Sequence, residues 1–231
     1  MIPPLKLIHA IGIAAVALTT TLNLLSEVNI PDEYKQGGFA IGCQAYTFNR
    51  FSVFEAIEKT AEAGARKVFE FAKKMGLRAV TTESTDAIDM IEQMVKEYDV
   101  MVGFHDHPRQ ANNPNYRMWD PYYILSVVKD RDKRIGSCAD TGHWQTSGLN
   151  PVFCLRVLKG HIISSHLKDK TDFGPGHDVP YGQGVGDVKR VLDELKKQGF
   201  EGNISIEYEY NWDNSVPDVK KCIEFVHDYG K

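Results

Sequence analysis

Two histidines and two carboxylates stand near the ends of four apolar stretches in the second half of the chain. The stretches, each with the composition of a β-strand, are Val100–His107, Ile135–Gly142, Ile162–Lys168 and Ile204–Glu209. Because successive side chains of a strand point to opposite faces, each stretch carries one metal-binding side chain on its less apolar face. The four candidate metal ligands are His105, Asp140, His166 and Glu207. Two imidazoles and two carboxylates suit one divalent ion such as manganese, cobalt, zinc or iron.

Other polar side chains should border the same site. The candidate catalytic residues are Glu207, His143 and Lys168, and the candidates for substrate contact are His107, His143 and Glu209. Glu207 is the best candidate base to remove a proton from the carbon next to a carbonyl, because its carboxylate would lie at the metal ion. His143 or Lys168 would steady a substrate oxygen. Two alternatives stay open: His143 could cap or orient its neighbours instead, and Lys168 could simply pair with Asp169.

This combination of groups predicts chemistry at a carbonyl carbon and the carbon next to it. A divalent ion polarises the carbonyl of a hydroxy-ketone and stabilises an enediolate-type intermediate. The expected reaction is therefore isomerisation or epimerisation of a sugar or keto-sugar. The alternatives are a keto-sugar lyase or hydratase using the same site, a metal-dependent hydrolase, and an inactive truncated barrel.

The elements that must position these residues alternate between strand and helix. Two further strands are predicted at Phe39–Ala45 and Leu77–Glu83, and helices at Ser52–Met75, Asp86–Tyr98, after Asp120, after Asn150, at Asp187–Lys197 and at Pro217–Tyr229. This order indicates an α/β fold with six parallel strands and right-handed crossovers, a (β/α) TIM-barrel-like arrangement. A closed barrel of eight strands needs about 250 residues, so we expect an incomplete barrel.

The junction at Gly64 is unusual, because two helical stretches meet there with no strand between them. The segment Ser52–Met75 contains no proline, and a single glycine costs only about 1 kcal/mol within a helix. We therefore expect one continuous helix, and a gap between the Phe39 and Leu77 strands.

Composition and the N-terminus set the remaining expectations. The 231 residues carry a net charge of −4 with no basic stripe, so we expect a small-molecule partner rather than nucleic acid. Residues 1–26 contain one charge, Lys6, before a mostly apolar run, which is typical of a signal peptide or an N-terminal anchor. An exported protein, touching a membrane only through that segment if it is uncleaved, is expected. Residues 27–38 would be a linker and residues 39–231 the domain.

Two other features are interpreted as structural. The four widely spaced cysteines form no CxxC pair and are expected to be buried free thiols. The sequence Gly182-x-Gly184-x-Gly186 lacks the third glycine of a dinucleotide fingerprint and is expected to form a flexible loop beside the site.

The ligand motifs resemble those of the xylose isomerase-like TIM barrels, the sugar phosphate isomerases and epimerases. That family has a ligand in an E/H-N-H-P stretch, then DTGH, then HLKD, then a strand ending I-E-Y/F. The matching residues are His105-Asp106-His107-Pro108, Asp140-Thr141-Gly142-His143, His166-Leu167-Lys168-Asp169 and Ile206-Glu207-Tyr208. The resemblance covers residues 39 to 229 and implies a divalent metal and a sugar substrate.

The sequence departs from the family pattern at two points. Many members have glutamate where His105 stands, and there two glutamates on opposite sides of the substrate share proton transfer. The family also places strand 2, helix 2 and strand 3 before the helix that contains Arg66–Met75, whereas here Ala63 to Arg66 joins the two helices directly. The resemblance thus implies a barrel without those three elements, in which all four ligand strands are kept.

Overall fold

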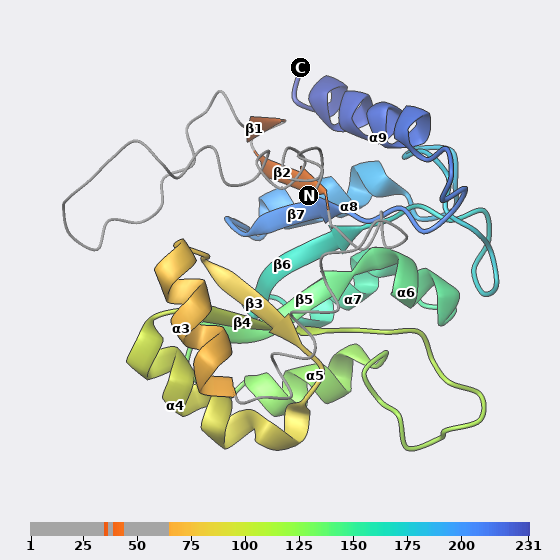
Figure 1. Cartoon of the computed structure of the whole chain (residues 1–231). Coiled ribbons are helices and arrows are strands. Elements are labelled where there is room, and N and C mark those ends of the chain that lie inside the picture. The colour runs from red at the N-terminus through yellow and green to blue at the C-terminus, as the bar shows by residue number, and fades with distance from the viewer. Residues whose placement is uncertain (1–34, 37–38, 44–64) are drawn as a thin grey trace, which may run out of the picture.

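The computed structural model describes residues 35–36, 39–43 and 65–231, whose strands form one sheet (Figure 1). The strands are β1 (Lys35–Gln36), β2 (Phe39–Cys43), β3 (Ala79–Thr82), β4 (Met101–His105), β5 (Ile135–Asp140), β6 (Ile162–Leu167) and β7 (Asn203–Ile206). Their order across the sheet is β1-β2-β7-β6-β5-β4-β3. Strands β2 to β7 pair in parallel, and β1 pairs with β2 antiparallel. The predicted α/β class and six parallel strands are confirmed.

Helices lie between the strands, and those from α5 to α8 begin at a side chain that caps them. They are α3 (Ala65–Met75), the 3-10 turn η3 (Thr85–Ala87), α4 (Ile88–Tyr98), α5 (Pro121–Val128), α6 (Thr141–Thr146), α7 (Pro151–Val157), α8 (Val188–Lys197) and α9 (Val216–Tyr229). At α5 and α7, Asp120 and Asn150 each accept a backbone hydrogen bond and a proline occupies the first turn. Figure 1 shows α3 and α4 together on the β3–β4 side of the sheet and α9 on the β7 side.

Strand β5 lies at the centre of the fold and is buried along its whole length. Its register against β6 shifts between Ser137 and Cys138, and this shift places Asp140 opposite His166. Just before the shift a Cβ on Gly136 would lie 2.2 Å from the carbonyl oxygen of His161, so only glycine allows the two strands to approach so closely.

The predicted gap between the first and second strands is present. Over the described residues, β2 pairs only with β1 and β7, and β3 pairs only with β4, so these two strands close no ladder. The sheet is therefore a curled half-barrel rather than a closed one. Of the helix predicted over Ser52–Met75, the described part is α3, and residues 52–64 lie outside the described residues.

Helix α6, which the sequence did not predict, follows strand β5 without a loop. Helix α6 begins at the next residue, because the Asp140 side chain accepts a hydrogen bond from the backbone N–H of His143 (2.8 Å) and so serves as its cap. The residue chosen as a metal ligand thus also starts the helix that carries His143.

The N-terminal predictions cannot be followed in the structure. Residues 1–26, the signal-like segment, lie outside the described residues, and of the predicted linker only Lys35–Gln36 is described, as β1. Among the helices that the structure describes, none combines the length and apolar character that crossing a bilayer requires.

Candidate metal and substrate site

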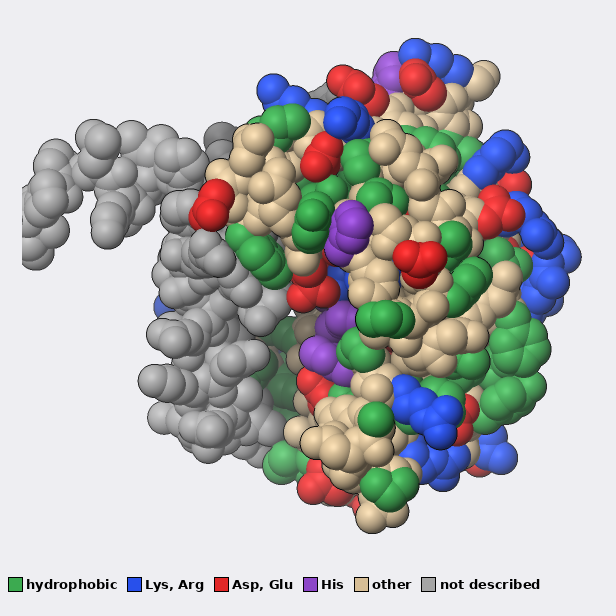
Figure 2. Space-filling view, turned by 90° about the vertical axis from the view of Figure 1, so that its right-hand side faces the viewer, with side chains coloured by type: hydrophobic (Ala, Val, Ile, Leu, Met, Phe, Trp, Pro, Cys, Tyr) green, Lys and Arg blue, Asp and Glu red, His purple; other side chains and the backbone are tan. Residues whose placement is uncertain are grey.

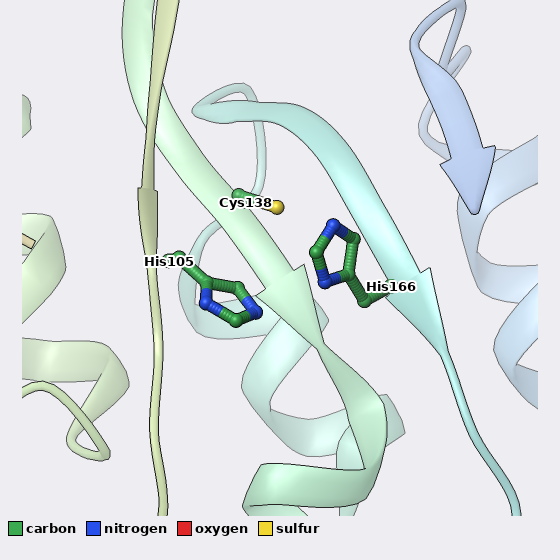
Figure 3. Close-up of side chains that lie close together, drawn as sticks. All are labelled: His105, Cys138 and His166. Atoms are coloured by element: carbon green, nitrogen blue, oxygen red, sulfur yellow. The ribbon is translucent and has the colours of Figure 1, made fainter. Parts of the chain in front are cut away.

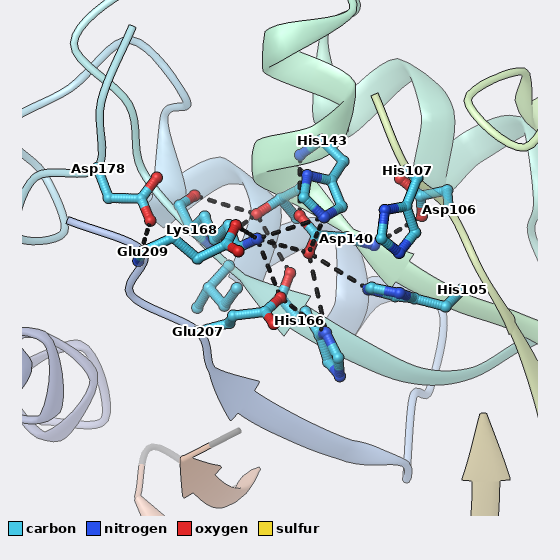
Figure 4. A network of polar contacts seen from close by, with 12 residues as sticks. His105, Asp106, His107, Asp140, His143, His166, Lys168, Asp178, Glu207 and Glu209 are labelled. Carbon is cyan, nitrogen blue, oxygen red and sulfur yellow. Dashed lines mark hydrogen bonds and ion pairs between the residues drawn. The ribbon is translucent and has the colours of Figure 1, made fainter. Parts of the chain in front are cut away.

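The four predicted metal ligands come together at the carboxyl ends of β4 to β7 (Figure 4). One donor atom from each of His105, Asp140, His166 and Glu207 lies within 4.8 Å of the others. His166 Nδ1 is 3.0 Å from Glu207 Oε2, and His105 Nε2 is 3.4 Å from Asp140 Oδ2. Parallel strands present their ends at the same edge of the sheet, which is why residues so distant in sequence meet.

Two donor atoms of this cluster are buried without a hydrogen-bond partner. These atoms are His105 Nε2 and Asp140 Oδ2. Asp140 Oδ2 has ion-pair contacts with Lys168 Nζ (3.1 Å) and His105 Nε2 (3.4 Å) but no hydrogen bond, and buried polar atoms without a hydrogen bond are rare and can take a further partner such as an ion. Asp140 is fully buried, and His105 Nε2 faces it. The donor set therefore fits a divalent cation, by its chemistry and by its unsatisfied atoms.

The protonation of the cluster suits ligand roles. Burial lowers the pKa of His166 to about 4 and that of His143 to about 2, so both imidazoles are neutral and keep a lone pair. Burial alone would raise the pKa of Asp140, but the Lys168 ammonium beside it outweighs burial and holds that pKa well below its usual range. Burial raises the pKa of Glu207 to about 8, with Lys168 opposing, and a bound cation would favour its ionised form.

The Lys168 side chain extends into the cluster and does not pair with the Asp169 carboxylate. Its ammonium is fully buried, 3.1 Å from Asp140 Oδ2 and 2.9 Å from Glu207 Oε2, and it also donates to Glu209 Oε2. One ammonium against three carboxylates leaves two negative charges unbalanced when all three are ionised. That excess is the charge of one divalent ion.

The DTGH and HLKD motifs are joined by contacts between them. The Thr141 hydroxyl donates to the Lys168 carbonyl (3.0 Å) and accepts from the Lys168 N–H (2.9 Å). A Cβ on Gly142 would lie 2.5 Å from the Lys168 side chain, so the glycine makes room for the lysine stem. These contacts aim the Lys168 side chain into the cluster.

Asp169 has a different partner, the glycine-rich loop. Its carboxylate accepts backbone hydrogen bonds, all of 2.9 Å, from the N–H groups of Gly182, Gly184 and Gly186. A Cβ on Gly184 would lie 2.4 Å from Asp169 Oδ1, which explains the residue type. The loop expected here to be flexible is thus tied to the end of β6 by three hydrogen bonds to one buried carboxylate.

The predicted substrate-contact residues surround the cluster. His107 stacks on His143 with 4.8 Å between ring centroids, and its Nε2 is 3.1 Å from Glu83 Oε1. His143 Nε2 lies 3.5 Å from Asp140 Oδ2 and also 3.5 Å from Lys168 Nζ. Figure 2 shows histidine and acidic side chains close together on this face of the molecule. The structure thus gathers every predicted site residue at one place.

Sequence reasoning missed three buried residues that support the site. Asp106 accepts a hydrogen bond from the Asp140 N–H (2.7 Å), and Asp178 accepts from the Glu209 N–H (2.6 Å). Gln145 donates to the Thr141 and Lys168 carbonyls (3.1 and 3.2 Å). Asp106 follows a predicted ligand directly, which was a usable signal, but strand alternation places it on the opposite face. Asp178 and Gln145 carry no local signal.

Comparison with known proteins gives one family match over most of the chain. The family model described as xylose isomerase-like TIM barrel matches residues 6–229. An uncharacterized protein of Methanocaldococcus jannaschii is 30% identical over 146 residues, which are 60% of this chain and 45% of that protein. L-ribulose-5-phosphate 3-epimerase of Salmonella paratyphi A is 36% identical over 73 residues, 31% of this chain and 25% of the enzyme. The chain therefore matches less than half of the length of these curated relatives.

Among solved structures, an uncharacterized protein of Parabacteroides distasonis superposes with a TM-score of 0.52 at 34% identity. That superposition covers 71% of this chain and 63% of the other. The likeness therefore extends over more than two thirds of this chain.

Proposed function

Because the chain belongs to the xylose isomerase-like TIM barrel family, we propose that it is a divalent-metal-dependent isomerase or epimerase of a sugar or keto-sugar. The observation that carries the proposal is the convergence of His105, Asp140, His166 and Glu207, two of whose buried donor atoms make no hydrogen bond. An epimerase among its relatives, acting on L-ribulose 5-phosphate by its name, agrees with this reaction class.

In this proposal, the same four residues hold the ion. When bound, a divalent ion supplies polarisation of a substrate carbonyl. Glu207 accepts the proton from the carbon next to that carbonyl, since it is a carboxylate at the centre of the site. To the buried Lys168 ammonium and to His143 Nε2, 3.5 Å apart, the proposal assigns the stabilisation of negative charge on the substrate oxygen.

A keto-sugar lyase or hydratase is the second candidate, and His105 favours it. In many relatives a glutamate at this position would complete a pair of bases on opposite sides of the substrate. With a histidine at position 105, only two of the four ligands are carboxylates. Asp140 caps helix α6, so Glu207 is the single carboxylate base. Removal of one proton by Glu207, followed by loss of a neighbouring hydroxyl, needs only that base. The proposal also includes export through residues 1–26, which favours a free or oxidised sugar over a phosphorylated one.

The experiment is turnover of keto-sugars by the full chain, with metal content measured on the same samples. We expect about one divalent ion per chain, and Glu207→Gln should nearly abolish turnover. Glu201→Gln, on the exposed surface, is the matched control and should keep the wild-type rate. Full activity of a metal-loaded Glu207→Gln variant would exclude Glu207 as the base. Metal-free wild-type protein that still turns over substrate would exclude the metal-dependent reaction, and an inert loaded protein would favour the truncated, inactive barrel.

A further inference from the structure

Cys138 lies next to the proposed metal ligands. It is fully buried on β5, two residues before Asp140 and on the same face of the strand. The register places it directly opposite His105 on β4 and Ser164 on β6. Figure 3 shows its sulfur on the side of the sheet from which the rings of His105 and His166 project. Its thiol is therefore part of the surface that surrounds the ligands.

The Cys138 sulfur lies close enough to His105 and His166 to bind the same ion as their rings. One donor atom each of His105, Cys138 and His166 lies within 4.8 Å of the others. Gly103 on β4 makes this placement possible, because a Cβ there would lie 2.9 Å from Cys138 Cβ. His105, a member of this group, has a buried Nε2 that makes no hydrogen bond, so the thiol adjoins an imidazole that can still bind an ion.

We propose that Cys138 is a further ligand of the metal site and that the site therefore prefers thiophilic divalent ions. This inference rests on the proposed function, which supplies the other ligands. A thiolate favours zinc, cobalt or cadmium over manganese or magnesium, which prefer oxygen donors. A cysteine thiolate with the imidazoles of His105 and His166 forms the sulfur and nitrogen part of a donor set typical of zinc-like ions.

Coordination requires a small movement and the loss of one proton. Zinc–sulfur and zinc–nitrogen bonds of about 2.3 and 2.0 Å hold tetrahedral donor atoms roughly 3.5 Å apart, so the side chains must close slightly around the ion. The thiol proton leaves to solvent as the metal–sulfur bond forms, and no oxidant or reductant is involved.

The test is the absorption spectrum of the full chain loaded with cobalt. A thiolate bound to Co²⁺ gives an intense near-ultraviolet charge-transfer band, whereas nitrogen and oxygen ligands alone do not. We expect this band in the wild-type protein and in Cys154→Ser, a control at another buried free cysteine. Cys138→Ser should lose the band and bind Co²⁺ roughly tenfold more weakly relative to Mn²⁺.

The outcomes separate this inference from the proposed function. Wild-type protein that binds one Co²⁺ without the charge-transfer band would overturn the ligand role of Cys138 and leave the four-residue site intact. Wild-type protein that binds no Co²⁺ would overturn both. Because the wild-type spectrum alone decides, the test does not depend on the folding of Cys138→Ser.

Discussion

At the scale of single residues, Lys168 decides the charge of the site. Three carboxylates surround its buried ammonium, and burial alone would lower its pKa, yet Asp140 and Glu207 raise that pKa well above the usual range. The lysine therefore stays charged and offsets part of the repulsion among the carboxylates. A divalent ion bound by His105, Asp140, His166 and Glu207 would offset the rest.

Replacing Lys168 with methionine should destabilise the metal-free protein more than the metal-loaded one. Removing one member of a buried ion cluster leaves uncompensated charge and costs about 3 kcal/mol or more of unfolding free energy. A divalent ion held by the same carboxylates would restore part of this loss. Urea unfolding with and without Zn²⁺ measures both quantities, and Lys133→Met, on the exposed surface, is the control. Equal losses in the two conditions would show that the lysine and the ion do not share those carboxylates.

His166 should be essential for binding the ion. It is buried, neutral at pH 7, and 3.0 Å from Glu207 Oε2. His166→Ala should lower the affinity for a divalent ion at least tenfold, since it removes a ligand and not merely a neighbour of one. Calorimetric titration measures this, with the exposed His227→Ala as control. Unchanged affinity in His166→Ala would contradict the assignment of the site.

At the scale of elements, one side chain is central to the loop between β6 and α8, which Gln145 and Asp178 also help to hold. The Asp169 carboxylate accepts from three glycine N–H groups, and the Gly184 and Gly186 backbones approach so closely that a Cβ on either would collide with a neighbour. The same loop carries Asp178, which accepts from the Glu209 N–H. The HLKD motif thus places the ligand His166 and orders the loop beside it.

Replacing Asp169 with asparagine should loosen this loop. An amide can accept hydrogen bonds through only one atom, so part of the charge-assisted set is lost, at a cost of about 2 kcal/mol in unfolding free energy. Hydrogen exchange at Gly182, Gly184 and Gly186 should accelerate, and proteases should cut within residues 170–186 more readily. Asp172→Asn, in the same loop but exposed, is the matched control. Unchanged exchange at the three glycines would show that other contacts hold the loop.

At the scale of the whole molecule, the half-barrel has a protected centre and open edges. Strands β5 and β6 have partners on both sides and are largely buried, whereas β3 pairs on one side only within the described residues. All ligands lie on β4 to β7, close to the protected centre. The absence of a β2–β3 ladder therefore leaves the ligand strands intact.

Amide hydrogen exchange should follow this order across the sheet. Groups in β5 and β6 open only with global unfolding, whereas an edge strand opens locally at lower cost. Mass spectrometry of exchange in the full chain should find β5 and β6 most protected and β3 exchanging earlier. Protection of β3 equal to that of β5 would indicate that another segment covers its free edge.

The sequence by itself located the six parallel strands and several helix starts, although each predicted strand runs past the end of the observed one. Alternation within a strand assigns His105, Asp140, His166 and Glu207 to one face, and polar residues before Pro121 and Pro151 mark helix starts, because these signals act over a few neighbouring residues. The directly joined helical stretches around Gly64 also predicted the missing ladder between β2 and β3.

Only the tertiary structure decided which groups touch. Alternation assigns a face but not a register, and the register shift before Cys138 sets Asp140 opposite His166 and Cys138 opposite His105. The partner of Lys168 likewise depends on contacts between strands and loops far apart in sequence, so Asp169 next to it binds glycine N–H groups instead. Such choices are made by packing and burial across the sheet, which the spacing of residues along the chain does not encode.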